Sequence, residues 1–460
     1  MSNSSRYAES VDLEIEGLST SGDGMARLGA RRIFIPFTIP GERVRARVPR
    51  APADVTAVLL DVLRPSPHRV VPPCAHFGLR AQSHDGPCGG CAWQHIDYPE
   101  QLRLKTALVG RLVQATVPSA PRPAPIATAS PLDNPWGYRQ KVHFVFGNRT
   151  GAPGRALVMG HYARGSRRVI PTMECPVHDP RGNAVAFDLI DRYARVRIAA
   201  AGTDSGVLQG VAVRVGCNTP ELMATVVVTN GSDRRLRKAT QEAVDASAAT
   251  AFHLNFHPKD DGFVFGGETR RLSGSDRMRE RVAGASFLIS PTAFFQTNVH
   301  AAQLLVSLVL QAVPERSRVL DLYAGAGLFA IPLARAGHRV TAIEENREAI
   351  ADGEASARLN RLDPSRCRFI SRRVELALSK VPAIDAVVLD PPRDGCAPGV
   401  LDAVFGRIRP RIGVYVSCNP EVLATDLRVI TGHGYAIQSI QPVDMFPHTA
   451  HVEALAVVTR

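Results

Sequence analysis

The alternation of apolar and polar residues predicts a small β module at the start of the 460-residue chain. Residues 11–16 and 43–48 alternate strictly, and 56–63 is another short apolar run. A period of two indicates strands with one buried and one solvated face. Because several short strands are separated by glycine-containing turns, residues 1–70 are predicted to form a small, OB-like β-barrel.

The middle of the chain, residues 71–270, is predicted to be a mixed, β-rich domain. It begins with a group of cysteines and a helical segment, 99–118, which we expect to pack on the C-terminal domain. Residues 119–135 are rich in proline and alanine and are interpreted as a connection. Runs of alternating residues after this connection predict a mostly antiparallel sheet, with strands at 138–146, 211–215 and 223–228.

From residue 271 to the end, short apolar strands alternate with helices. The expected strands are 318–322, 338–344, 368–370, 384–389 and 412–417, and the expected helices are 328–336 and 347–360. Near-continuous apolar strands between helices indicate a parallel sheet covered on both faces. The last two runs, 436–443 and 453–459, can add an antiparallel edge. This combination predicts an α/β fold of the class I methyltransferase, Rossmann-like type.

The chain is basic, with a net charge of +12. This charge favours a polyanionic partner, although an arginine-rich composition alone would give the same sign. Three arginines on one face of strand 43–48 suit a phosphate backbone as well as a solvated face. There is no apolar run of about 18 residues and no apolar export signal at the N-terminus. We therefore expect a cytoplasmic protein that has no membrane partner.

A candidate ligand site lies at the predicted carboxyl edge of the C-terminal sheet. Gly325 and Gly327 follow strand 318–322 and allow a tight turn with a close approach of the backbone to a ligand. Glu344 ends the next strand, where an acid can accept hydrogen bonds from ribose hydroxyls. Asp390 follows strand 384–389 at the same edge. The glycine spacing differs from that of dinucleotide-binding turns.

Cys418 follows strand 412–417 and is therefore expected at this edge as well. A cysteine taken alone is more often a buried structural residue, but the neighbouring ligand site favours chemistry. A thiolate that adds to C6 of a uracil makes C5 nucleophilic enough to accept a methyl group. A base must then remove the C5 proton. Cys418 is the candidate nucleophile and Glu453 the candidate base.

Four other cysteines suggest a metal site. Cys88 and Cys91 are separated by two glycines, a spacing that lets both thiolates share one site. Cys74 and Cys175 are the more distant candidates. Four thiolates can hold an iron–sulfur cluster or zinc, and a site without metal is the third alternative. The chain has eight cysteines in all, and Cys217, Cys367 and Cys396 have no assigned role.

Taken together, these segments resemble the RNA uracil-C5 methyltransferases, and the resemblance extends from about residue 8 to the C-terminus. The barrel resembles a TRAM domain, an RNA-binding module. The four cysteines resemble the [4Fe-4S] ligands of the branch that acts on 23S ribosomal RNA. The motifs that carry the resemblance are Ser290-Pro291, Phe294–Asn298, Asp321–Gly325, Asp390–Arg393, Ser417–Pro420 and Phe446–Glu453.

The resemblance implies methyl transfer from S-adenosylmethionine to C5 of a specific uridine in structured RNA, namely 23S rRNA, through a covalent Cys418–C6 adduct that Glu453 resolves. It also implies a [4Fe-4S] cluster and an enzyme that acts as a monomer. Leu328 and Arg373 depart from the residues that the family usually has near the cofactor. The implied cofactor contacts are Gln296, Tyr323, Gly325, Gly327, Glu344 and Asp390, and the implied RNA contacts are Phe294, Arg139 and Lys141.

Three alternatives differ in substrate or in class. A tRNA uracil-C5 methyltransferase would use the same chemistry. A DNA cytosine-C5 methyltransferase also has a cysteine nucleophile, but its Pro-Cys lies after an earlier strand, where this chain has Asp390-Pro-Pro. A non-catalytic rRNA-binding or assembly factor would need neither Cys418 nor Glu453.

Overall fold

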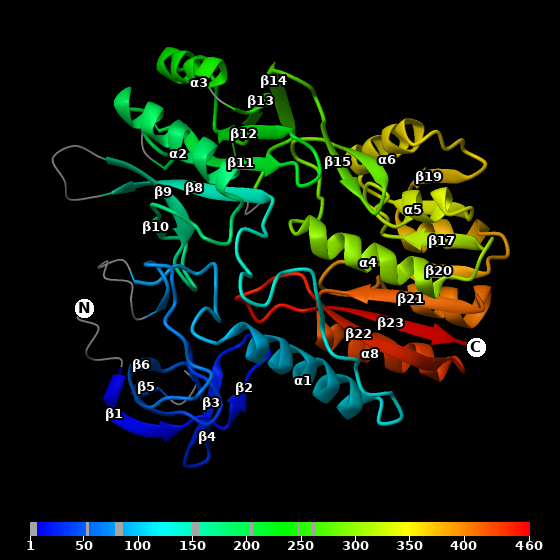
Figure 1. Ribbon diagram of the computed structural model, residues 1–460, viewed down its shortest axis with the longest axis horizontal. Helices are drawn as coiled ribbons and strands as arrows, with labels where there is room; N and C mark the ends of the chain where they lie inside the picture. Colours follow the sequence, from blue (N-terminus) through cyan, green and yellow to red (C-terminus); the bar gives the residue numbers. More distant parts are fainter. Residues whose placement is uncertain are drawn as a thin grey trace.

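A computed structural model describes residues 7–51, 55–78, 86–149, 156–202, 206–246, 248–258 and 264–460. The chain forms an N-terminal β module, a central sheet and a C-terminal α/β unit, coloured blue, green and yellow to red in Figure 1. Among the described residues, no helix is both long and apolar enough to cross a membrane.

The N-terminal module consists of two antiparallel three-stranded sheets around a small apolar core that includes Ile33 and Val44. The outward side chains of one strand include Arg43 and Arg45, which form ion pairs of 3.5 and 2.9 Å with Asp12. The positive charge of this face is therefore partly offset. The strands are β1 (Tyr7–Glu14), β5 (Arg43–Pro49) and β6 (Val58–Arg64) in one sheet, and β2 (Gly17–Leu18), β3 (Gly24–Leu28) and β4 (Arg31–Ile35) in the other.

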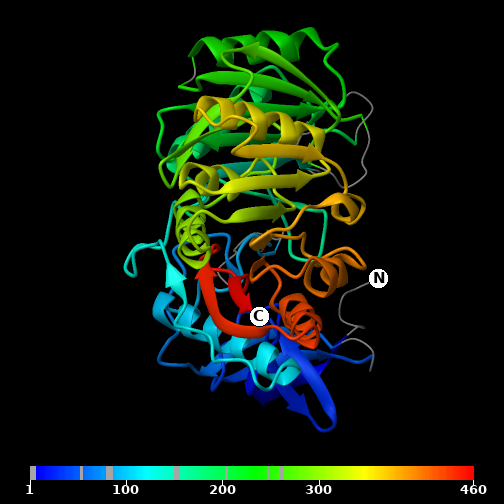
Figure 2. The same cartoon turned by 90° about the vertical axis from the view of Figure 1, so that its right-hand side faces the viewer.

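The central part is a seven-stranded sheet in which β12 and β13 are parallel and the other neighbouring strands are antiparallel. Two helices, α2 (Pro180–Arg195) and α3 (Arg234–Ala246), pack on it through buried residues such as Tyr193 and Leu236; they are seen at the top of Figure 2. In sheet order, the strands are β10 (Val169–Pro171), β9 (Ala156–Tyr162), β8 (Lys141–Arg149), β11 (Leu208–Val215), β12 (Leu222–Val228), β13 (Ala251–Phe256) and β14 (Glu268–Ser273).

The C-terminal unit contains an eight-stranded sheet. Its first five strands are parallel, β23 is antiparallel to both of its neighbours, β21 and β22, and β7 adds a parallel edge beside β22. The connection 119–135 was expected to hold no strand, but β7 lies within it and pairs with the last part of β22. In sheet order, the strands are β19 (Cys367–Ser371), β18 (Arg339–Glu344), β17 (Arg318–Leu322), β20 (Ala386–Leu389), β21 (Ile412–Ser417), β23 (Glu453–Thr459), β22 (Ala436–Asp444) and β7 (Ala127–Thr128).

Helices cover both faces of this sheet, and a separate hairpin precedes it. α4 (Val299–Ala312) and α5 (Ala330–Arg335) share one apolar core, and α1 (Tyr98–Thr116), α7 (Val374–Ala377) and α8 (Pro420–Gly432) share the other. Helix α1 comes from the middle of the sequence, yet its Val109 and Val113 pack with α8. The remaining elements are α6 (Arg347–Leu359), the hairpin β15 (Met278–Val282) and β16 (Ala285–Ile289), a 3-10 turn (Leu378–Lys380) and a π-helical segment (Asp402–Ile408).

The order of the strands in the C-terminal sheet determines where the candidate ligand site lies. From β17 the chain moves outward to β18 and β19, and it then returns to the other side of β17 to form β20 and β21. Such a reversal opens a crevice at the carboxyl ends of the strands on either side of it. The glycine turn after β17, Asp390 after β20 and Cys418 after β21 all lie at that edge.

Candidate active site

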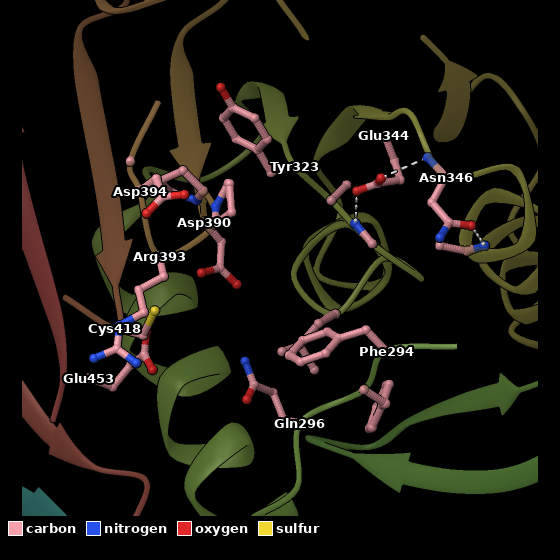
Figure 3. Close-up of a pocket in the computed structure, with 18 of the residues that line it drawn as sticks. Phe294, Gln296, Tyr323, Glu344, Asn346, Asp390, Arg393, Asp394, Cys418 and Glu453 are labelled. Carbon is pink, nitrogen blue, oxygen red and sulfur yellow. Dashed lines mark hydrogen bonds between the residues drawn. The ribbon is translucent and has the colours of Figure 1, made fainter. Parts of the chain in front are cut away.

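A cavity of about 1120 Å³ lies at the carboxyl edge of the C-terminal sheet. Figure 3 shows Cys418, Glu453 and Arg393 at one end of it and Glu344 at the other, with Asp390 between them. Nine of the predicted catalytic, cofactor and RNA-contact residues line this cavity: Arg139, Phe294, Gln296, Tyr323, Gly325, Glu344, Asp390, Cys418 and Glu453. Two others, Gly327 and Lys141, do not belong to its lining.

The glycine turn and Glu344 form one end of the cavity. The backbone N–H of Gly325 donates to Glu344 Oε2 over 3.0 Å, and that of Asn346 donates to Oε1 over 2.8 Å. Both donors fix the carboxylate at the end of β18, with oxygen lone pairs left for a ligand. Gly325 has a φ of 54°, a conformation that glycine adopts without strain. This end is suited to the hydroxyls of a nucleoside.

Gly327 has a structural reason to be glycine that differs from the predicted one. A Cβ at this position would lie 2.7 Å from the ring of Phe369, and its φ is 84°. Gly327 therefore allows the helix after the turn to pack closely on β19, and its contact with the cofactor stays a prediction. The second glycine of the turn serves helix–strand packing.

Tyr323 shapes the loop that follows Asp390. It also has a positive φ, 60°, and its hydroxyl accepts a hydrogen bond of 3.0 Å from the backbone N–H of Ala397. A non-glycine residue in this region is held there by its surroundings at a cost of roughly 1–3 kcal/mol. Tyr323 thus connects the turn after β17 to the loop after β20, and both border the cavity.

Cys418 lies among ionisable groups at the other end of the cavity. The pKa of its thiol is raised to about 11, mainly by burial and then by the carboxyls of Glu453 and Asp390, whereas the Arg393 guanidinium opposes the rise. Burial also raises the pKa of Asp390 to about 7. The pKa of Glu453, whose side chain is almost wholly buried, is raised well above its usual value by burial and by Asp390. A carboxylate of high pKa is a stronger base than an exposed one.

Phe294 and the two basic residues of the predicted RNA surface differ in their placement. Phe294 lines the cavity and is 72% exposed, so its ring is accessible to a planar ligand. Arg139 also borders the cavity. Lys141, in contrast, lies over the ring of Phe265 at 5.2 Å, and its burial lowers its pKa to about 7. Lys141 does not line the cavity, and its contact with RNA stays a prediction.

Comparisons with known proteins agree with this geometry. A family model described as tRNA (Uracil-5-)-methyltransferase matches residues 277–460, and the TRAM domain model of tRNA (uracil(54)-C(5))-methyltransferase matches residues 11–67. An uncharacterized RNA methyltransferase of Gloeobacter violaceus is 36% identical over 98% of this chain and 97% of its own. One of Thermosynechococcus vestitus is 33% identical over 98% of each.

The chain belongs to the RNA uracil-C5 methyltransferase family. The solved structure of Pyrococcus abyssi tRNA (uracil-54, C5)-methyltransferase in complex with S-adenosyl-L-homocysteine is similar over 98% of this chain and all of its own. Its TM-score is 0.76 and its sequence identity 26%. The present protein is thus an S-adenosylmethionine-dependent RNA methyltransferase with an N-terminal TRAM domain. The α/β fold predicted from the sequence is confirmed, and the non-catalytic alternative is not supported.

Several residues of this methyltransferase site had no role in the sequence prediction. Arg393, Phe446 and His451 line the cavity, and the charge of Arg393 acts on Cys418. Their motifs were recognised, but only the tertiary structure places their side chains in this lining. The two departures from the family pattern, Leu328 and Arg373, also line the cavity. The guanidinium of Arg373 pairs with Glu375 at 2.5 Å.

The four cysteines predicted to bind a metal line a second cavity, of about 140 Å³. Residues 79–85 of the long segment between Cys74 and Cys88 lie outside the described residues. Burial is the main cause that raises the pKa of each of the four thiols. Gly90 and Arg139 border both cavities, so the cysteines lie next to the active site.

Four histidines, His76, His143, His161 and His178, also line this second cavity, and the sequence prediction gave none of them a role. Among the described residues, the three ligand atoms found within 4.8 Å of one another belong to His161, Cys175 and His178, and not to three of the four cysteines. The spacing Cys175-Pro-Val-His178 could have indicated this proximity, since two residues between ligands suit a shared ion. The cavity therefore offers two overlapping sets of metal ligands.

Proposed function

We propose that this enzyme methylates C5 of a specific uridine in 23S rRNA, with Cys418 as the covalent nucleophile and Glu453 as the base. The observation that carries the proposal is the group of Cys418 and Asp390, both half-buried, with the buried Glu453 in a cavity whose other end suits a nucleoside. S-adenosylmethionine would occupy the end with Gly325 and Glu344, and the uracil the end with Cys418.

Each cofactor residue has a role that its position supports. Glu344 accepts hydrogen bonds from the ribose hydroxyls, and the backbone of Gly325 lies against the adenosine. The sulfonium is a cation, so the carboxyl of Asp390 between the two ends attracts it electrostatically. Gln296 and Tyr323 complete the contacts of this end. The methyl group is thereby aimed at the uracil end.

The uridine must leave its stack to reach the half-buried thiol inside the cavity. The exposed ring of Phe294 gives the base a surface on which to stack. Arg139, at the border of the cavity, is placed to contact the phosphate backbone, and the TRAM domain adds further RNA contacts. Lys141 does not line the active-site cavity, so its proposed contact with RNA lies outside that cavity.

The reaction proceeds through a covalent adduct. The Cys418 thiolate forms a bond to C6, and the electron pair of the C5–C6 double bond moves into the C4 carbonyl to give an enolate. C5 of the enolate attacks the methyl carbon, whose bond to the sulfonium breaks and releases S-adenosylhomocysteine. Glu453 removes the proton from C5, the double bond re-forms, and the thiolate leaves C6. Arg393 favours the thiolate form because its charge opposes the two carboxyls.

We further propose that Cys74, Cys88, Cys91 and Cys175 hold a [4Fe-4S] cluster. The four thiols line one cavity. Their sulfur atoms are not as close together as the ligands of a single tetrahedral ion must be, and this wider spacing suits the larger cluster. A cluster here would cross-link the segment before α1 to the segment before α2. Zinc on His161, Cys175 and His178 is the competing occupant.

Metal analysis of two variants separates these occupants. Anaerobically purified Cys74→Ser protein should lose the iron and the absorbance near 400 nm, because a cluster ligand is missing. His161→Gln protein should keep both. If His161→Gln instead loses a bound zinc ion and Cys74→Ser loses nothing, the cavity holds zinc and the cluster assignment is wrong.

A tRNA is the second candidate substrate. The solved relative that spans the whole chain is named as a tRNA (uracil-54, C5)-methyltransferase, and its TRAM domain model matches here too. The cysteine set favours 23S rRNA, by its resemblance to the ribosomal branch. The chemistry at Cys418 is the same for both substrates.

Mapping of 5-methyluridine in a deletion strain tests the substrate. We expect the loss of one modified position in 23S rRNA, restored by the wild-type gene and not by Cys418→Ala. Unchanged 23S rRNA with a lost 5-methyluridine in tRNA would establish the second candidate. Unchanged modification of both RNAs would contradict the two assignments.

A further inference from the structure

The loop 445–452 connects β22 to β23 and leads directly into Glu453. Its Phe446, Thr449 and His451 line the active-site cavity. Glu453 pairs in register with Val443, the residue before Asp444. The position of the Glu453 carboxyl therefore depends on how both ends of this loop are held.

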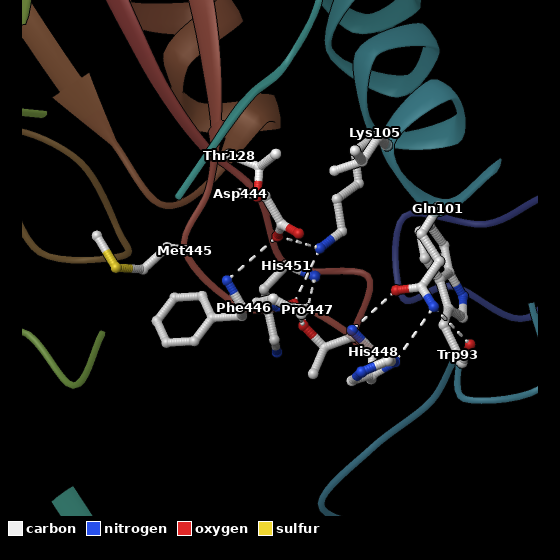
Figure 4. A network of polar contacts seen from close by, with 12 residues as sticks. Trp93, Gln101, Lys105, Thr128, Asp444, Met445, Phe446, Pro447, His448 and His451 are labelled. Carbon is white, nitrogen blue, oxygen red and sulfur yellow. Dashed lines mark hydrogen bonds and ion pairs between the residues drawn. The ribbon is translucent and has the colours of Figure 1, made fainter. Parts of the chain in front are cut away.

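A buried ion pair holds the first end of the loop. Lys105 Nζ, on α1, donates to Asp444 Oδ1 over 2.6 Å, and both side chains are wholly buried. The same ammonium donates to the carbonyl of Phe446 over 2.9 Å, and the Tyr98 hydroxyl donates to Asp444 Oδ2 over 2.8 Å. Figure 4 shows Lys105 and Asp444 meeting at the start of the loop.

His448, in the middle of the loop, is held from several segments. Its φ is 65°, which is uncommon for a non-glycine residue. Its backbone N–H donates to the Gln101 side chain over 2.8 Å, and its carbonyl accepts from the backbone N–H groups of Ala92 and Trp93 over 3.1 and 2.9 Å. Its ring stacks on Trp136 with centroids 3.6 Å apart. These hydrogen bonds and the ring stacking together hold His448 in this uncommon backbone conformation.

The TRAM domain reaches the same loop. The Trp93 indole N–H donates to the carbonyl of Gly22 over 2.8 Å. Trp93 and Ala450 belong to one small apolar cluster, and a Cβ on Gly22 would lie 2.5 Å from that of Ala450. The loop is therefore packed between the TRAM domain, α1 and the active site.

We propose that Lys105 and Asp444 are positioning residues that aim the Glu453 carboxyl at the C5 proton. A buried ion pair contributes little net stability, because desolvation of both charges offsets their attraction. Its geometric effect is larger, since the ammonium binds Asp444 and Phe446 at once and fixes the turn out of β22. This inference rests on the proposed role of Glu453.

The double variant Lys105→Met/Asp444→Asn tests the inference. Both replacements are neutral and close in volume, so no unpaired charge is buried, and the oxygen of the introduced amide still accepts from Tyr98. We expect RNA and cofactor affinity and the rate of adduct formation to stay within about threefold of wild type. Resolution of the methylated adduct should slow by roughly 10- to 100-fold, since a misplacement of about 1 Å has that effect.

Arg69→Met/Glu42→Gln is the matched control. It removes another ion pair with a buried carboxylate, of 2.5 Å, whose two residues do not line the active-site cavity. Its adduct should resolve at the wild-type rate. Equal slowing in this control, or wild-type resolution in the Lys105/Asp444 variant, would overturn the inference.

Two further measurements keep the outcome clear. If thermal unfolding shows that the double variant does not fold, Gln101→Leu replaces it. This variant releases His448 without burying a charge and should also slow resolution of the adduct. Resolution at the wild-type rate in Gln101→Leu would overturn the inference.

Glu453→Gln is measured alongside. If Glu453→Gln accumulates no adduct, the role of Glu453 fails; if it does and the Lys105/Asp444 variant does not, only the positioning role fails.

Discussion

Replacement of Cys418 by alanine should reduce methyl transfer by about 10⁴-fold or more, a loss typical of a missing covalent nucleophile. Without the C6–S bond, C5 of the uracil is too weak a nucleophile to attack the sulfonium. Binding of RNA and of S-adenosylmethionine should persist, since other residues provide most of the cavity surface. Transfer of a radiolabelled methyl group to RNA under single-turnover conditions measures the loss.

Cys217→Ala provides the control for this variant. The Cys217 thiol lies 3.1 Å from His300 Nε2 and outside the lining of the active-site cavity. Its removal should leave the rate within a few-fold of wild type. Residual turnover near wild type in Cys418→Ala would show that methylation does not need this thiol.

Replacement of Glu453 by glutamine should trap a covalent protein–RNA adduct. The amide has nearly the same volume but cannot accept the C5 proton, so the methylated base stays attached to Cys418. Loss of a general base lowers turnover by roughly 10²- to 10⁴-fold. Denaturing gels with labelled RNA should show a slowly migrating band that contains the transferred methyl group.

Glu421→Gln, on the first turn of α8, controls for loss of a nearby carboxylate. It should show the low adduct level of wild type. Loss of methyl transfer in Glu453→Gln without any adduct would assign Glu453 to an earlier step, such as binding. The gel therefore separates a role in release from a role in assembly of the site.

The core of the site could be predicted because parallel strands present their carboxyl ends at one edge. Asp390 and Cys418 each follow a short apolar strand and Glu344 ends one, and this local pattern was enough to bring them into one cavity. The N-terminal β module followed in the same way from strict alternation, and the family resemblance identified it as a TRAM domain. Local periodicity and strand ends are properties that a sequence displays directly.

Features that depend on distant packing could not be predicted. The need for glycine at 327 comes from Phe369 on another strand, and Lys141 lies on Phe265. The strand β7 arises in a proline-rich connection because it completes the edge next to β22. The contacts of Lys105 join residues more than 300 positions apart. No local pattern indicates such pairs.

The central claim is that Cys418 bonds to the uracil that is methylated. Wild-type enzyme incubated with 5-fluorouridine-substituted RNA and S-adenosylmethionine tests it most directly, because fluorine at C5 cannot be removed as a proton and the adduct persists. After nuclease and protease digestion, mass spectrometry should find a methylated fluorouridine nucleotide on the peptide that contains Cys418. A nucleotide bound to another residue, or complete absence of a covalent adduct from active enzyme, would contradict the account.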